Sequence, residues 1–195
     1  MMSLAKQRFT FLNKFIESPA QVGSITPSSK FLVNKMFENV SWDKLDTIVE
    51  LGAGTGVFTN HIFERKKVST KAVIIEKDTQ MRLNLEKSYP SLIFGPDAER
   101  LDLLLHKLNI PQVDCIVSGL PFANFPLELR KNIMEAITKS LKPDGLFIAF
   151  QYSLQMKSML KQYFHHVEIG LEVRNLPPAF VYTCKKKKEG RLEWI

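Results

Sequence analysis

Val49-Glu50-Leu51-Gly52-Ala53-Gly54-Thr55-Gly56 is the stretch of sequence that decides the fold. It joins the end of a short β-branched run, residues 47–51, to three glycines at alternate positions. Glycines directly after a strand let the backbone turn sharply and let a ligand approach it closely. The dinucleotide fingerprint reads Gly-x-Gly-x-x-Gly, whereas this stretch reads Gly-x-Gly-x-Gly with an acid two positions before the first glycine. The stretch therefore predicts a ligand-binding turn after a strand, of a kind that differs from the NAD fingerprint.

Short apolar runs alternate with helical patterns along the rest of the chain. The expected strands cover residues 47–51, 71–76, 92–95, 113–118, 146–150, 166–171 and 179–184. The expected helices cover residues 78–87, 98–107, 127–141 and 156–164. Strands alternating with helices form a parallel sheet, but no helix separates the last two strands, which should pair antiparallel. The sequence predicts an α/β fold with a doubly wound, seven-stranded, mostly parallel sheet and one antiparallel edge strand.

The composition is that of a globular chain able to bury a core. Of 195 residues, 45% are apolar and 24% charged, which excludes disorder as the whole description. Cys115 and Cys184 both lie in apolar runs, which favours buried free thiols in a reducing compartment and excludes a disulfide framework. No apolar stretch approaches the roughly 18–20 residues of a membrane span, and no signal-peptide pattern is visible. We therefore expect a cytoplasmic protein, which can also lie on the inner membrane face.

The formal net charge of +7 is concentrated at the two ends of the chain. Residues 1–36 carry five Lys or Arg against one Glu, and residues 185–195 carry five against two. Residues 4–16 form an expected amphipathic helix whose phenylalanines, Phe9, Phe11 and Phe15, are interleaved with basic residues. Such a helix suits an anionic membrane surface, although it can equally pack on its own domain. We expect N-terminal amphipathic or lid helices over residues 1–40 and the main domain over residues 41–195.

The acidic-x-Gly-x-Gly-x-Gly pattern resembles the first motif of class I S-adenosylmethionine-dependent methyltransferases, which have a Rossmann-like fold. The resemblance implies S-adenosylmethionine as the cofactor. Glu76 ends the second strand, where the family's acid accepts from the ribose hydroxyls; the alternative is a solvated strand end. Asp97 would accept from the adenine amino group, with the Ala98 N–H on a ring nitrogen, unless Asp97 only caps the next helix. The expected cofactor-binding residues are Glu50, Gly52, Ala53, Gly54, Gly56, Glu76, Asp97, Ala98, Ser118 and Gly119.

The turn after the fourth strand reads Ser118-Gly-Leu-Pro-Phe-Ala-Asn-Phe-Pro126. A Leu-Pro-aromatic sequence here resembles the motif of amino methyltransferases, in which proline fixes a turn that points a carbonyl at the reacting amine. The alternative is an ordinary strand-to-helix loop. The resemblance implies that Phe122 and Phe125 can face an ammonium group. The expected catalytic residues are Leu120, Pro121, Phe122 and Asn124.

Two families of amino methyltransferase compete at this turn. Ribosomal RNA adenine dimethyltransferases have Asn-Leu-Pro-Tyr, but Gly119 replaces the amide side chain here, unless Ser118 or Asn124 substitutes for it. Bacterial phospholipid N-methyltransferases have Ser-Gly-Leu-Pro-x-x-Asn-Phe-Pro, which is matched throughout, and residues 15–29 and 175–179 are similar to theirs as well. This second resemblance implies methylation of the amine of a phosphatidylethanolamine-type phospholipid at the membrane face. RNA adenine N6-methylation, or methylation of another small molecule or a protein, is the alternative.

Other features of the sequence carry less chemistry. His165 and His166 are adjacent, but no cysteine or carboxylate cluster accompanies them, so we expect no metal. Thr26, Ser28 and Ser29 can cap a helix that begins there or, in the functional interpretation, close over the cofactor. We expect a monomer.

Overall fold

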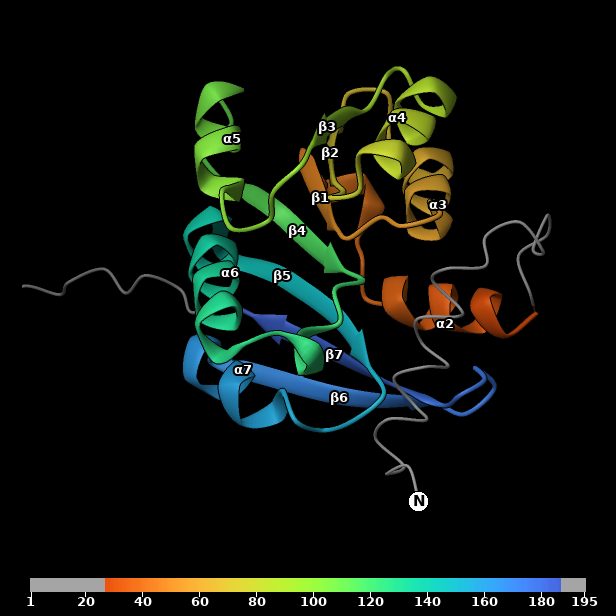
Figure 1. The fold of residues 1–195 in the computed structure, drawn as a ribbon, viewed down its shortest axis with the longest axis vertical. Coiled ribbons are helices and arrows are strands. Elements are labelled where there is room, and N and C mark those ends of the chain that lie inside the picture. The colour runs from red at the N-terminus through yellow and green to blue at the C-terminus, as the bar shows by residue number, and fades with distance from the viewer. Residues whose placement is uncertain (1–26, 187–195) are drawn as a thin grey trace, which may run out of the picture.

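The computed structural model describes residues 27–186, which Figure 1 draws in colour. The strands are β1 (Thr47–Leu51), β2 (Lys71–Ile75), β3 (Ile93–Gly95), β4 (Val113–Ser118), β5 (Leu141–Gln151), β6 (His166–Glu172) and β7 (Ala179–Lys185). The helices are α2 (Pro27–Phe37), α3 (Val57–Arg65), α4 (Thr79–Ser88), α5 (Leu101–Lys107), α6 (Leu127–Ser140) and α7 (Lys157–Tyr163), with short 3-10 turns η2 (Trp42–Lys44) and η3 (Phe122–Asn124). The expected helix over residues 4–16, Thr26 and most of the basic C-terminal tail lie outside the described residues.

The seven strands form one sheet in the order β3-β2-β1-β4-β5-β7-β6. The first five run parallel, and the chain crosses from one side of β1 to the other between β3 and β4. β7 runs antiparallel to both β5 and β6, so the hairpin formed by the last two strands closes one edge. The predicted α/β fold with a mostly parallel, seven-stranded sheet is confirmed. Its strand order puts the ends of β1 and β4 side by side, where doubly wound folds bind ligands.

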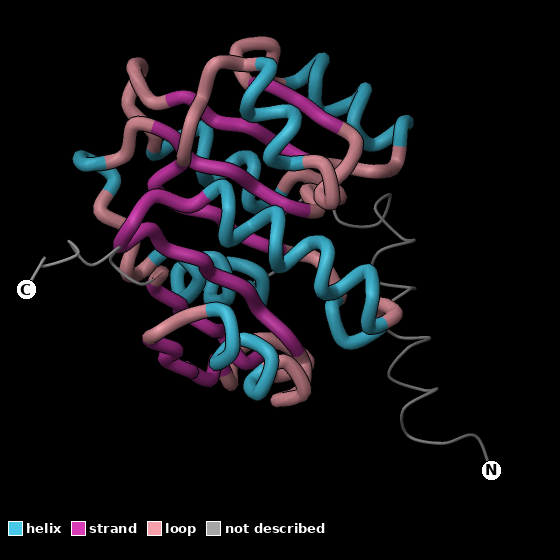
Figure 2. The backbone as a smooth tube through the Cα atoms, turned by 90° about the vertical axis from the view of Figure 1, so that its left-hand side faces the viewer, coloured by secondary structure: helices cyan, strands magenta, loops and turns pink. Residues whose placement is uncertain are grey.

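Helices cover both faces of the sheet, as Figure 2 shows. On one face, α5, α6 and α7 contribute Leu101, Ile137 and Leu160 to an apolar cluster with the strands. On the other face, α2 and α3 contribute Met36 and Ile62 to a second cluster. The central strands are therefore buried on both sides, which explains why they read as continuous apolar runs rather than as alternating patterns.

Two expectations from composition can be checked within this core. Cys115 and Cys184 are free and buried, as predicted, and burial raises the pKa of each thiol to about 12. A thiol with such a pKa stays protonated and unreactive near neutral pH. Across residues 27–186, no helix is both long enough and apolar enough to span a bilayer.

Candidate active site

The glycine-rich turn lies at the carboxyl end of β1, and all three of its glycines have positive φ. The backbone N–H groups of Gly52 and Ala53 both donate to the carbonyl of Ile75, at 2.8 and 3.2 Å, so the turn is fastened to the end of β2. At Gly54, with φ of 54°, an added Cβ would meet no atom within 4 Å. The turn therefore has open space above its middle glycine, where a ligand can approach the backbone.

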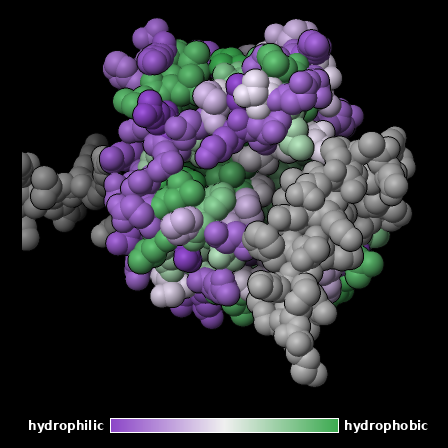
Figure 3. Space-filling model, in the orientation of Figure 1, coloured by the Kyte–Doolittle hydropathy of each residue, from purple (hydrophilic) through white to green (hydrophobic). Residues whose placement is uncertain are grey.

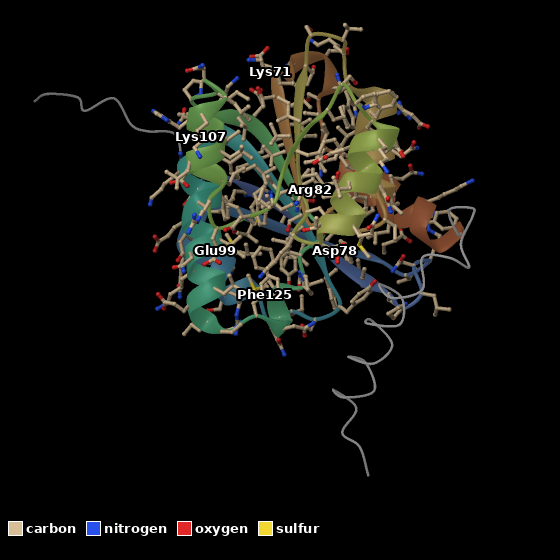
Figure 4. The ribbon with its side chains drawn as sticks, turned by 45° about the horizontal axis from the view of Figure 1, so that its top comes forward. Lys71, Asp78, Arg82, Glu99, Lys107 and Phe125 are labelled. Carbon is tan, nitrogen blue, oxygen red and sulfur yellow. The ribbon has the colours of Figure 1, made fainter. Side chains whose placement is uncertain are left out.

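Glu76 closes one side of this turn. Its Oε2 accepts from the backbone N–H of Gly54 at 2.7 Å, and its Oε1 accepts from the N–H of Asp78 at 2.8 Å. Arg82 of α4 donates to the Glu76 carbonyl at 2.7 Å. A carboxylate has about four lone-pair positions, so Glu76 can still accept from a pair of hydroxyl groups. In Figure 4, Asp78 and Arg82 mark this side of the site, whereas Glu99 and Phe125 lie across from them.

Glu50 lies beneath the turn and is completely buried. Its Oε2 accepts from the hydroxyl of Thr59 at 2.6 Å, but its Oε1 has no hydrogen-bond partner among the described residues. Burial raises the pKa of Glu50 to about 8; the Thr59 hydrogen bond opposes this and the charge of Glu76 adds to it. A buried carboxyl oxygen without a partner costs free energy unless a donor arrives. Open space at Gly54 and this unpaired oxygen together fit a ligand that carries hydroxyl groups and positive charge.

Asp97 and Ala98 lie half-buried in the loop after β3. The Oδ1 of Asp97 accepts from the N–H of Glu99 at 2.9 Å, and its Oδ2 is 3.7 Å from the Nε of Arg100. The N-cap of α5 is Arg100, so Asp97 closes a local turn and does not cap that helix. Its side chain thus remains a candidate for the adenine contact.

The turn after β4 is fastened directly to the glycine-rich turn. The N–H of Gly119 donates to the carbonyl of Leu51 at 2.8 Å, and an added Cβ on Gly119 would lie 2.8 Å from the carbonyl oxygen of Gly52. The buried Ser118 hydroxyl accepts from the N–H of Leu120 at 3.2 Å. The expected cofactor turn and the expected acceptor turn are therefore neighbours in space, although about 70 residues separate them in the chain.

The side chains of this second turn are arranged differently from the expectation. Phe122 is completely buried, and its ring packs edge-on against Phe125 and Phe147 with centroids 6.0 and 6.4 Å apart. The prediction that the Phe122 ring faces an ammonium is therefore wrong in this structure, because η3 turns that ring into the core. Phe125 is half-buried and Asn124 is exposed, so both stay accessible at the turn.

Gln151, at the end of β5, is a site residue that the sequence interpretation missed. It is buried, and its Nε2 donates to the carbonyl of Leu120 at 2.9 Å. Its Oε1 accepts from the N–H of Ala123 at 3.4 Å. The only signal in the sequence is a polar residue closing an apolar strand at the same edge as the two turns.

The two adjacent histidines lie at the start of β6. His165 and His166 have ring centroids 6.4 Å apart. Within residues 27–186, no three His, Cys, Asp or Glu side chains are grouped to hold a metal ion.

A curated relative matches nearly the whole chain. The ornithine lipid N-methyltransferase of Singulisphaera acidiphila is 31% identical over 190 residues, which is 95% of this chain and 99% of that protein. The chain belongs to that enzyme's family. It is an S-adenosylmethionine-dependent methyltransferase, and S-adenosylmethionine is its cofactor. No family model matches the sequence of this methyltransferase.

Two further comparisons concern the fold of the methyltransferase and its similarity to adenine methyltransferases. The structure of the N-methyltransferase NodS of Bradyrhizobium japonicum, in complex with S-adenosylhomocysteine, matches with a TM-score of 0.70 at 11% identity. The match covers 91% of this chain and 97% of that chain, and it shows that the two proteins share a fold. The dimethyladenosine transferase of Yarrowia lipolytica is 25% identical over 120 residues, which is 60% of this methyltransferase but 34% of that relative. The match to the adenine enzyme is thus partial, and that to the lipid enzyme nearly complete.

Proposed function

We propose that this methyltransferase transfers a methyl group to the amine of a membrane lipid, of which a phosphatidylethanolamine-type phospholipid is the first acceptor to test. The observation that carries the proposal is the match over 95% of the chain to a protein named for N-methylation of an amine-bearing lipid. The sequence Ser118–Pro126 supports it, because its resemblance to the phospholipid enzymes extends over the whole turn. The enzyme would then work in the cytoplasm as a peripheral protein on the inner membrane face.

The proposed cofactor residues follow from the two turns. Glu76 would accept from the ribose hydroxyls and Asp97 from the adenine amino group, with the Ala98 N–H beside it. Glu50 would receive the cationic amino-acid end at its Oε1, which has no partner among the described residues, and the positive charge beside it would favour the ionised carboxylate. Gly52, Ala53, Gly54 and Gly56 would form the backbone surface on which the cofactor lies, completed by Ser118 and Gly119. When bound, the cofactor supplies an activated methyl group on its sulfonium.

The turn of Leu120, Pro121, Phe122 and Asn124 would position the amine. Pro121 holds the turn, and the buried Phe122 ring anchors it to the core, so its contribution to the acceptor is the fixed backbone rather than its ring. Asn124 and Phe125 are the accessible side chains at the acceptor's entrance. Positioning is expected to supply most of the rate, because the donor is already activated and the amine needs only to lose a proton and attack in line.

Adenine N6-methylation of RNA is the second candidate, and the partial matches to dimethyladenosine transferases favour it. Gly119 weighs against it, because the resemblance places an amide side chain there in the adenine enzymes. Exposed Asn124 is the residue that could substitute for that amide.

One assay separates these acceptors. Purified enzyme with methyl-labelled S-adenosylmethionine is offered phosphatidylethanolamine in mixed micelles, ornithine lipid, ribosomal RNA, and lysate protein. Labelled lipid with unlabelled RNA and protein is the expected result. Labelled RNA with unlabelled lipid would overturn the proposal in favour of the adenine enzyme, and labelled protein alone would overturn both.

A further inference from the structure

The loop between β6 and β7, residues 173–178, presents large apolar side chains to solvent. Val173 is 66% exposed and Leu176 is 73% exposed. Leu154, in the loop after β5, is also exposed, and the side chain of its neighbour Tyr152 shares a hydrogen bond with Asn175. Soluble proteins seldom gather such side chains on adjoining loops without a partner for them. Figure 3 shows hydrophobic surface at the lower right, where Figure 1 places this loop.

The topology places this loop on the side of the sheet where β4 and β5 have their carboxyl ends, which is also the side of the active site. β6 and β5 both pair antiparallel with β7, so β6 ends where β5 ends. β5 in turn runs parallel to β4, whose carboxyl end carries the acceptor turn. The exposed apolar loop and the entrance for the methyl acceptor therefore face the same direction, although the loop belongs to the far end of the sheet.

Three contacts hold the turns of this loop in place. Arg174 forms a fork with the buried carboxylate of Glu172, with Nε to Oε1 at 2.8 Å and Nη2 to Oε2 at 2.9 Å. The Arg174 guanidinium also lies 4.1 Å from the ring centroid of Phe31 in α2. Inside the loop, the buried Asn175 amide donates to the carbonyl of Pro177 at 2.7 Å. Glu172 and Asn175 are buried at the base of the loop, whereas Val173 and Leu176 stay exposed to solvent.

Basic side chains lie in the loop and beside the strand that leads into it. Arg174 pairs with the buried Glu172, and Lys35 of α2 lies against Gly170 of β6. Exposed apolar side chains with cations beside them match the interface of an anionic bilayer, where acyl chains lie beneath phosphate groups. RNA would match the cations but would leave the aliphatic side chains of Val173 and Leu176 without a partner.

We propose that the β6–β7 loop is a membrane-docking surface that inserts Val173 and Leu176 into the interface of an anionic lipid bilayer. The proposal rests on the proposed function, because a lipid head group can enter the acceptor turn only if this side of the sheet faces the bilayer. Docking through the loop would hold the entrance against the membrane and let the amine rise from the head-group layer into the site.

The test compares wild type, the double variant Val173→Ser/Leu176→Ser, and Val68→Ser as matched control. Val68 is fully exposed but lies in the loop before β2, on the side of the sheet where the parallel strands begin. The first measurement is co-sedimentation with vesicles of phosphatidylethanolamine and phosphatidylglycerol. Loss of two interfacial aliphatic side chains should weaken vesicle binding by about tenfold in the double variant and leave the control like wild type. Equal vesicle binding by all three proteins would overturn the proposal.

A second measurement separates docking from catalysis. Methyl transfer is measured on the same vesicles and on a short-chain phosphatidylethanolamine below its critical micelle concentration. We expect the double variant to lose activity on vesicles but to keep its activity on the monomeric lipid. Its affinity for S-adenosylhomocysteine should equal that of the wild type. A wild type that methylates neither form refutes the proposed function, whereas loop-dependent vesicle binding would still support docking. If the double variant loses RNA binding and not vesicle binding, the loop is a nucleic-acid surface and the proposal fails.

Leu176→Trp gives an independent reading that does not depend on losing a function. The indole should enter the bilayer interface, so its emission should shift to the blue when vesicles are added. Val68→Trp, on the opposite side of the sheet, should show no shift. Equal responses from the two variants would contradict docking through the loop.

Discussion

The side-chain amide of Gln151 donates to the carbonyl oxygen of Leu120 at 2.9 Å and accepts from the N–H of Ala123 at 3.4 Å. The end of β5 thereby holds both sides of the turn at which the acceptor amine is expected. The Leu120 carbonyl also accepts from the N–H of Phe122 at 2.9 Å, so Gln151 adds a link from β5 to a turn that already has a hydrogen bond of its own.

Gln151→Leu should slow methyl transfer while leaving the cofactor site intact. The change keeps the volume but removes both hydrogen bonds, and we expect kcat to fall by about tenfold. The affinity for S-adenosylhomocysteine, measured by calorimetry, should stay within about twofold, because the side-chain amide of Gln151 bonds to the acceptor turn and not to the glycine-rich turn. The exposed Gln155→Leu is the control. A kcat that is unchanged would show that the turn keeps its shape without this residue.

Glu76→Gln should weaken cofactor binding. The carboxylate accepts from the N–H groups of Gly54 and Asp78, and a neutral amide would replace one acceptor by a donor facing a donor. The loss of a charge-assisted hydrogen bond corresponds to a decrease in S-adenosylhomocysteine affinity of about tenfold or more. Glu135→Gln, on the exposed face of α6, serves as the control for carboxylate loss. Equal affinities in the two variants would show that Glu76 does not contribute to cofactor binding.

Two glycine substitutions should have different effects on ligand binding and on the stability of the fold. Gly54→Ala meets no atom within 4 Å, so its cost to the fold is the positive φ, about 1–2 kcal/mol or a few degrees in Tm. Its methyl group would occupy the open space above the turn and should abolish S-adenosylhomocysteine binding. Gly119→Ala meets the Gly52 carbonyl oxygen at 2.8 Å, so we expect a larger decrease in Tm. The reverse order of Tm values would contradict the geometry of the two turns.

The stability of the cofactor-free enzyme should depend on pH through Glu50. Burial raises the pKa of this carboxyl from 4.5 to about 8, so between these values the folded state holds a proton that the unfolded state has released. The free energy of unfolding should therefore decrease as pH rises from about 5 to 8 and level off above the folded-state pKa. Urea titrations at several pH values measure this, with Glu50→Gln as the control that lacks the titrating group. A wild-type profile parallel to that of the variant would show that Glu50 titrates normally.

Local patterns in the sequence were sufficient to predict the fold class. The β-branched run before Gly52, the Pro143-Asp144-Gly145 stop after α6 and the missing helix between β6 and β7 report contacts made within a few residues. Glu50 and Glu76 were predictable as site candidates for the same reason: each has a fixed place relative to the end of its strand. Helix ends were less predictable, since α5 begins at Leu101 rather than Ala98, because Asp97 closes a separate turn first.

By itself, the sequence determined the alternation of strands and helices, the ligand-binding turn and the concentration of charge at the chain ends, because each is written in neighbouring residues. Only the tertiary structure decided that the Phe122 ring turns into the core, that Gln151 fastens the acceptor turn, and that Val173 and Leu176 are exposed on the same side of the sheet as the active site. These features depend on which strand lies beside which. The order β4-β5-β7-β6 brings together residues far apart in the chain, and no local spacing records it.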